Sequence, residues 1–140
     1  MSVIKGKIIV GTATKMYVNG VCRPYTNKVS WKVTKDYDDK SFMGEYGTYP
    51  IYLGYNVEGT IEESKTDSYY EKIVLESAES GIDPDITIIV NLNNPRTNAS
   101  EVVKLTGVVF TEAGSEPETK QLVNVSIPFK AEKAELIDSI

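Results

Sequence analysis

The chain has 140 residues, of which 41% are hydrophobic and 25% charged, and its formal net charge is −5. This is the composition of one globular domain that can bury a core without disulfides or metals, and it excludes a disordered chain. The sequence has no run of 18 apolar residues and no standard secretion signal at its start, so we expect no membrane association, and its negative charge disfavours nucleic acid as a stable partner.

The first predicted elements are strands joined by a tight turn. Asn19 and Gly20 both tolerate a positive φ, so this pair favours a type I′ hairpin turn. Residues 27–37 then alternate between apolar and polar side chains, which predicts a strand with one buried and one solvated face. Trp31 is therefore a candidate for the core. The apolar positions of this strand are Val29, Trp31, Val33 and Tyr37.

Residues 35–55, KDYDDKSFMGEYGTYPIYLGY, combine six aromatic residues with three glycines and a proline. We interpret residues 38–54 as a long irregular loop. A monomer that exposed these rings would carry an adhesive patch, whereas an arm buried against a second subunit would be ordered by that contact. The alternative is a lid that folds back over the subunit's own sheet. The candidate subunit or ring interface residues are Phe42, Met43, Tyr46, Tyr49 and Tyr52.

A second alternating strand is predicted over residues 55–64. Tyr55, Val57 and Ile61 fall on one face of it. The polar positions between them carry only acidic or neutral side chains. We therefore expect the apolar face to pack on an opposite sheet and the polar face to meet water.

One helix follows within residues 65–81, because apolar side chains recur there at spacings of three and four. Thr66, Asp67 or Ser68 can cap its start, and Ser68 with Glu71 fits a capping box. Gly81 suits the left-handed C-terminal position, and Pro84 ends the helix. Three more strands are predicted, over residues 85–92, 100–114 and 118–132. Because strands and helices do not alternate, we predict a mainly β fold: an antiparallel β-sandwich or open barrel with one flanking helix, in a single domain.

The sequence offers little for catalysis. Histidine is absent, which removes the commonest general base and metal ligand and excludes a Ser–His triad. The one cysteine, Cys22, excludes an internal disulfide and a cysteine zinc site. Acidic pairs such as Asp83 and Asp85 lie at element ends, which is typical of solvated turns rather than of a glycosidase. We therefore predict no enzyme activity, no cofactor and no metal site.

The order of elements and several short phrases resemble a known family. The phrases are GTATKMYVNG, VEGTIEES, ITIIVNLNNP, VVKLTGVVF and LVNVSIPFKAE, with the predicted helix between the second and the third. Over nearly all of residues 6–138 the chain resembles the tail tube proteins of contractile-tailed phages, defective prophages and phage-tail-like bacteriocins. It is most similar to the short branch of these proteins found in Gram-positive bacteria.

The resemblance implies a structural role. Six subunits would form a ring, and the rings would stack into a hollow tube inside a contractile sheath. The partners would be further copies of the chain, the sheath protein, and baseplate and tape-measure proteins, with DNA as a transient cargo. The protein would be made in the bacterial cytoplasm and end in a virion tail or a phage-tail-like particle. The segment 38–54 would reach a neighbouring subunit or ring.

The resemblance also implies an inner sheet that faces the channel. A channel that passes DNA should be polar but not strongly basic, because lysines and arginines would retain the phosphates. We favour residues 55–64 for this wall because the polar face of that strand is acidic or neutral. The candidate lumen residues are Asn56, Glu58, Thr60 and Glu62.

Three other functions remain open at this stage. One is a related tube, from a non-contractile phage or a type VI secretion system. Another is a free β-sandwich binding module whose aromatic loop stacks sugars. The last is a hydrolase that works through carboxylates alone.

Overall fold

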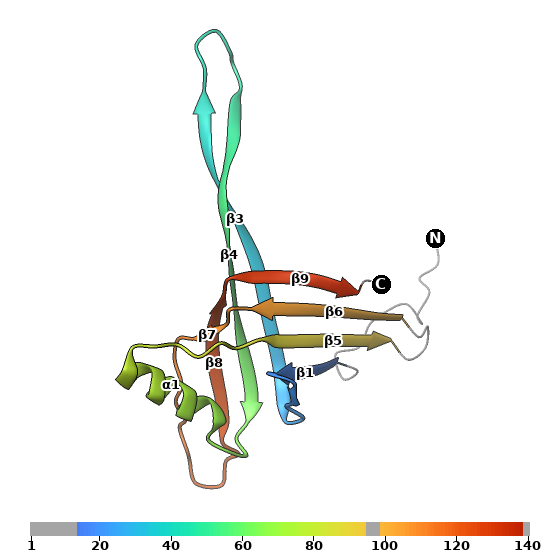
Figure 1. Ribbon diagram of the computed structural model, residues 1–140, viewed down its shortest axis with the longest axis vertical. Coiled ribbons are helices and arrows are strands. Elements are labelled where there is room, and N and C mark those ends of the chain that lie inside the picture. The colour runs from blue at the N-terminus through green and yellow to red at the C-terminus, as the bar shows by residue number, and fades with distance from the viewer. Residues whose placement is uncertain (1–13, 95–98, 139–140) are drawn as a thin grey trace.

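The computed structural model describes residues 14–94 and 99–138, which form two antiparallel β-sheets and one helix (Figure 1). The predicted fold class is confirmed. The first sheet has the order β2-β1-β5-β6-β9, with strands β1 (Thr14–Val18), β2 (Val21–Cys22), β5 (Ile88–Asn94), β6 (Ala99–Thr106) and β9 (Lys133–Asp138). The second has the order β3-β4-β8-β7, with strands β3 (Thr26–Ser41), β4 (Thr48–Ser64), β7 (Val109–Phe110) and β8 (Asn124–Ala131).

The core lies between the two sheets, and each sheet contributes one face to it. In β4, Val57 and Ile61 are buried while Glu58 and Glu62 are exposed, so the predicted division of this strand into two faces is confirmed. The same alternation runs along β8, where every second residue is buried. Fully buried side chains from both sheets include Val18, Ile88, Leu105, Ile127 and Phe129.

Two tight backbone turns set the path of the chain. Asn19 and Gly20 have φ values of 49° and 81°, as the predicted hairpin turn requires. Gly107, at φ 64°, lies between β6 in the first sheet and β7 in the second. The prediction of one strand over 100–114 was therefore wrong: the chain changes sheets at this glycine. In the described part of the chain five strands follow the helix rather than three, because the predicted strand 100–114 is divided into β6 and β7, and β9 was not predicted.

The helix α1 (Tyr69–Ser80) lies at one end of the sandwich, beside β7 (Figure 1). Gly81 is left-handed, with φ 71°, and its N–H donates to the Ser77 carbonyl, as predicted. The predicted capping box was wrong, since the Ser68 side chain makes no capping bond and the Asp67 carboxylate accepts from the Tyr69 N–H at 3.3 Å instead. No helix among the described residues is long and apolar enough to cross a membrane.

The hairpin of β3 and β4 projects far beyond the rest of the subunit (Figure 1). We call its projecting part, residues 35–55, the arm. The prediction of an irregular loop over 38–54 was wrong, because β3 runs to Ser41 and β4 starts at Thr48, so only residues 42–47 form a turn. The lid alternative is contradicted as well, because the arm extends away from its own sheets and its side chains are exposed.

Candidate subunit interface

The two faces of the β3–β4 hairpin follow from its register. We call the face that carries Val57 and Ile61 the core-side face, because these residues pack into the sandwich. The opposite face, which carries Glu58 and Glu62, is the outer face. Val33 pairs with Val57 across the two strands and therefore belongs to the core-side face.

A β-bulge at Leu53 changes which tyrosines share a face. Asp36 pairs with Gly54 but Tyr37 pairs with Tyr52, so β4 carries one extra residue between the two pairs. Beyond this point the side chains of β4 exchange faces. Tyr52 joins Tyr37 on the core-side face, and the two rings meet edge to face at 5.7 Å.

An apolar stripe therefore runs along the core-side face and passes from the core into solvent. At its inner end Ile61 and Val57 are covered by the other sheet. On the edge strand β3, and on β4 from Tyr55 toward the tip, the apolar side chains of this face are 37% to 53% exposed. These side chains, which we call the stripe, are Trp31, Val33, Tyr37, Tyr52 and Tyr55.

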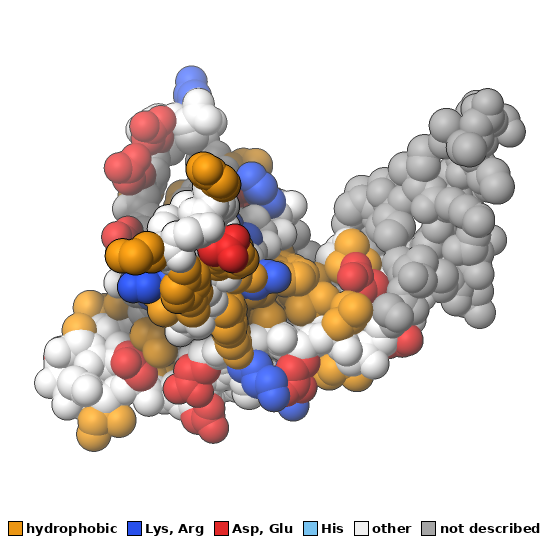
Figure 2. Space-filling view, turned by 90° about the horizontal axis from the view of Figure 1, so that it is seen from above, with side chains coloured by type: hydrophobic (Ala, Val, Ile, Leu, Met, Phe, Trp, Pro, Cys, Tyr) orange, Lys and Arg blue, Asp and Glu red, His pale blue; other side chains and the backbone are white. Residues whose placement is uncertain are grey.

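The placement of Trp31 in the core was therefore wrong. The alternation of β3 correctly identified the apolar face, and Val29 packs against the core. Nothing in the sequence indicated that Trp31, Val33 and Tyr37 would lie on an edge strand whose apolar face is half exposed, while Val57 opposite Val33 is buried. Viewed from above, hydrophobic side chains gather over the arm (Figure 2). Contiguous exposed apolar surface of this kind marks a protein–protein interface.

The five predicted interface residues lie on the arm but do not form one cluster. Met43 and Tyr46 are fully exposed in the turn at the tip. Phe42 and Tyr49 pair with each other on the outer face, with ring centroids 5.7 Å apart. Tyr52 belongs to the stripe. The other stripe residues, Trp31, Val33, Tyr37 and Tyr55, were not among the predicted interface residues, although their alternation placed them on one apolar face.

The outer face of the second sheet carries compensated charge. The candidate lumen residues Asn56, Glu58, Thr60 and Glu62 all project from it. The register places Glu58 between Lys32 on β3 and Lys130 on β8, and Lys32 lies 3.4 Å from its carboxylate. Glu62 lies opposite Lys28 in the same way. Glutamates and lysines thus share this face, so it is less acidic than β4 alone suggests.

Long strand edges accompany the stripe. β3 is the outermost strand of the second sheet, and all 16 of its residues form one edge. At the other side of that sheet β7 pairs only with Phe129 and Lys130, so no strand of the described residues pairs with the first half of β8 there. Unpaired edges of this length invite pairing with another chain.

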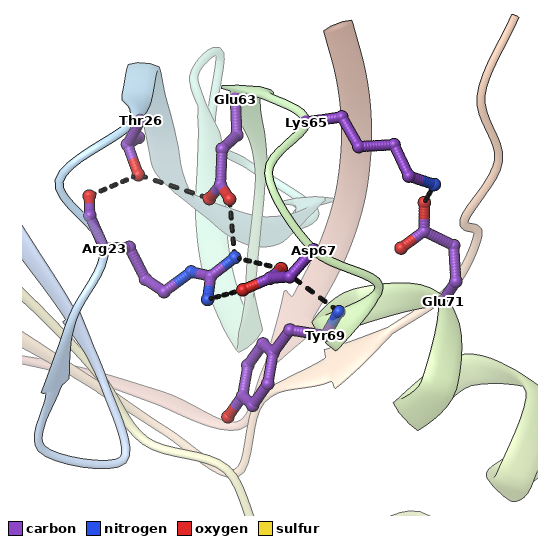
Figure 3. A network of polar contacts seen from close by, with 7 residues as sticks. All are labelled: Arg23, Thr26, Glu63, Lys65, Asp67, Tyr69 and Glu71. Carbon is purple, nitrogen blue, oxygen red and sulfur yellow. Dashed lines mark hydrogen bonds and ion pairs between the residues drawn. The ribbon is translucent and has the colours of Figure 1, made fainter. Parts of the chain in front are cut away.

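A buried ionic network holds the base of the hairpin to the helix (Figure 3). Arg23 donates to the buried Glu63 carboxylate at 2.5 Å and forms a two-pronged pair with Asp67 at 2.9 and 3.0 Å. The guanidinium also lies over the rings of Tyr69 and Tyr70, 4.9 and 5.0 Å from their centroids. The network therefore joins the loop between β2 and β3, the end of β4 and the segment that leads into α1, which indicates a structural role.

Charge and burial shift the acidities in this network. The hydrogen bonds from Arg23 lower the pKa of Asp67. The bond with Asp67 in turn raises the pKa of Arg23, which stays charged. Burial raises the pKa of Tyr70, whose hydroxyl stays neutral and has no hydrogen-bond partner among the described residues. None of these shifts places a group near neutral pH.

The described residues hold no group of three or more acidic or cysteine side chains that could bind a metal ion. Cys22 is exposed on β2. The described residues thus form a subunit with half-exposed apolar surface and open sheet edges.

A comparison with protein families identifies the group to which this fold belongs. Residues 1–138 match a family model described as phage tail tube protein. The chain belongs to this phage tail tube family. A comparison with curated protein sequences found no match.

Solved structures with the tail tube fold are similar to the chain although their sequences have diverged. A chain of the sheath–tube complex of the extracellular contractile injection system PVC is 13% identical, with a TM-score of 0.73 over 95% of this chain and 93% of that one. A chain of the anti-feeding prophage cap is 9% identical, with a TM-score of 0.78 over 99% and 97%. A chain of the SPP1 tail tube is 10% identical, with a TM-score of 0.69 over 95% and 81%. At these identities the similarity shows the fold.

Proposed function

We propose that this tail tube subunit forms hexameric rings that stack into a hollow tube inside a contractile sheath. The observation that carries the proposal is the apolar stripe along the β3–β4 hairpin, which the described part of the chain leaves half exposed. A stable subunit interface buries apolar side chains in this way, and Tyr and Trp are the residues that contribute most to such contacts. We take the whole chain, 1–140, as one tail tube domain whose assembly segment, expected over residues 38–54, lies within the arm.

The similarity to a chain of the PVC sheath–tube complex supports the contractile setting. The sheath protein, the baseplate and tape-measure proteins and further copies of this chain are the partners that follow. The subunit would be synthesised in the bacterial cytoplasm and incorporated into a virion tail or a phage-tail-like particle. Its role would be structural, without catalysis or a cofactor.

The outer face of the second sheet is the candidate channel wall. Its glutamates are matched by lysines on the neighbouring strands, so the wall carries little net charge. A DNA molecule would then release few counterions on contact and would not be retained by the wall. Asn56, Glu58, Thr60 and Glu62 would line the channel together with Lys28, Lys32 and Lys130.

A second setting is a tube without a contractile sheath around it. The SPP1 tail tube supports this alternative, and so does Hcp1 from Flavobacterium johnsoniae, which is 14% identical with a TM-score of 0.55 over 91% of this chain and 96% of that one. Electron microscopy of particles from the source cell distinguishes the settings, since only the contractile one shows a sheath around the tube.

Assembly of the purified protein tests the proposal. We expect rings or tubes in negative-stain electron microscopy, and large species in sedimentation, as the protein concentration rises. A free binding module would instead stay monomeric and bind sugars on a glycan array. A strictly monomeric protein at millimolar concentration would contradict the assembly role.

A further inference from the structure

Two tyrosines of the arm form an exposed aromatic contact. Tyr37 on β3 lies directly opposite Tyr52 on β4 in the strand register. Their ring centroids are 5.7 Å apart, with an interplanar angle of 60°. Tyr37 is 49% exposed and Tyr52 is 53% exposed. Two phenol rings are therefore held edge to face at a place that a solute can reach.

Exposure and contact coincide in this pair and in no other pair of tyrosines in the described ranges. Tyr69 and Tyr70 have ring centroids 5.4 Å apart at the start of α1, but Tyr70 is only 2% exposed. Tyr46 is fully exposed at the tip of the arm, but it contacts no other ring among the described residues. A reagent in solution thus meets two adjoining phenols only at Tyr37 and Tyr52.

The arm has little of its own to fix the register of its strands. Inside the sandwich, burial of Val57 and Ile61 fixes which face of β4 turns inward. The side chains of the arm are exposed on both faces, and strands without a buried face are prone to slip in register. The bulge at Leu53 lies in this same segment. A covalent bond between the strands on the tip side of the bulge would hold the observed register.

We infer that Tyr37 and Tyr52 are a site of oxidative cross-linking, at which a one-electron oxidant joins the two phenol rings as dityrosine. Each ring loses one electron and its phenolic proton, and the two tyrosyl radicals couple at ring carbons next to the oxygens. One carbon–carbon bond forms, and the hydrogen on each bonded carbon moves as a proton to the oxygen of its own ring. With a haem peroxidase as catalyst, one hydrogen peroxide takes up the two electrons and two protons and becomes two waters.

The geometry of the pair favours this reaction over coupling between subunits. The fold holds the two rings together, so the coupling becomes an intramolecular step. Residues directly opposite each other on one face of a sheet have neighbouring Cβ atoms, and the last torsion of a tyrosine side chain is soft. The rings can therefore turn until the carbons next to their oxygens meet, without a shift of the backbone.

The reaction belongs to the free subunit, because the proposed interface would cover both rings. The inference itself does not depend on that interface. It depends only on the contact between the two tyrosines within one hairpin.

Tryptic digestion and mass spectrometry test the inference. Dilute subunits are treated with a haem peroxidase and hydrogen peroxide and then digested. Cleavage after Lys35, Lys40 and Lys65 gives the peptides 36–40 and 41–65, and Tyr37 is the only tyrosine of the first. We expect the two peptides to remain joined, with a mass two hydrogen atoms below their sum, the fluorescence of dityrosine, and fragments that place the bond at Tyr52.

Two matched variants and one change of conditions serve as controls. Tyr37→Phe keeps the ring but removes the phenol, and it should abolish the joined peptide. Tyr46→Phe removes a fully exposed tyrosine that has no ring partner, and it should leave the yield unchanged. In urea, which unfolds the hairpin, the yield should fall roughly tenfold or more, since the rings are no longer held together.

The outcomes that contradict the inference are distinct from those that concern the tube. Folded subunits that give no joined peptide would overturn it. So would a bond that forms as readily at another tyrosine of the peptide 41–65, or a yield that is the same in urea, because the observed contact would then not select the pair. The proposed tube is tested separately, by microscopy of the untreated protein.

Discussion

Replacement of Tyr52 by alanine should weaken assembly far more than folding. Tyr52 lies in the stripe and exposes 53% of its surface in the subunit. A tyrosine side chain offers about 200 Å² for burial, so about 100 Å² remains to be covered by a partner. At about 25 cal/mol per Å² this contact is worth about 2.5 kcal/mol, which corresponds to a roughly 70-fold change in the dissociation constant.

The effect on the isolated subunit should be small. Within the subunit, Tyr52→Ala removes the edge-to-face contact with Tyr37, which is worth about 1 kcal/mol and lies outside the core. Phe129→Ala is the contrasting variant, because this ring is fully buried between the sheets and its loss should cost about 3 to 5 kcal/mol of folding free energy.

Two measurements check this prediction. Sedimentation at increasing protein concentration gives the threshold for assembly, and denaturant unfolding monitored by circular dichroism gives the stability of the subunit. Leu75→Ala, at an exposed position on α1, is the control for loss of an exposed apolar side chain and should leave both unchanged. The reasoning would be refuted if Tyr52→Ala lowered the free energy of unfolding as much as Phe129→Ala does, or left the assembly threshold where it was.

Three further predictions concern the fold itself. Gly59→Ala should destabilise the subunit by about 1 to 3 kcal/mol in denaturant unfolding, because a Cβ there would lie 2.1 Å from a backbone oxygen of β3; Gly47→Ala, which meets open space, should be neutral. Arg23→Met should cost about 3 to 5 kcal/mol in the same assay, since it leaves the buried Glu63 without its partner, and Arg23→Met/Glu63→Leu should recover most of the loss. Because Arg23 lowers the pKa of Asp67 in the folded protein, their ion pair stabilises the fold fully at any pH above the pKa of Asp67 in the unfolded chain, about 4. This stabilisation is lost as the pH falls through the lower pKa of the folded protein. The stability of Asp67→Asn should accordingly fall less steeply than that of the parent protein in acid titrations below pH 4, and an equal slope would argue against this pair.

Several local features were predictable because the residues that cause them are neighbours in the chain. Asn19 and Gly20 form their turn through their own backbone preferences. Gly81 ends the helix because it accepts a left-handed conformation at no steric cost. The faces of β4 were also predictable, since alternation of Val57, Glu58 and Ile61 depends only on the pleat of a strand.

The candidate interface was only partly predictable, for a different physical reason. The aromatic residues of the arm marked it as a surface for assembly, but their arrangement depends on a bulge at Leu53 that moves Tyr52 to the face of Tyr37. Such a register is decided by how two strands pair, and the sequence of either strand alone does not contain that information. For the same reason the sequence could not show that Gly107 passes the chain from one sheet to the other.

The sequence by itself determined which face of β3 is apolar, and the tertiary structure decided whether that face is buried. Val29 and Trp31 are two residues apart on one face of one strand, yet Val29 packs against the core and Trp31 is exposed. The difference does not follow from position along the hairpin, since Val57, opposite Val33 on the neighbouring strand β4, is still buried while Trp31 on the edge strand β3 is not. Whether a side chain is buried depends on what lies opposite it. In the sandwich that space is filled by strands distant in the sequence, and along the arm it is left open.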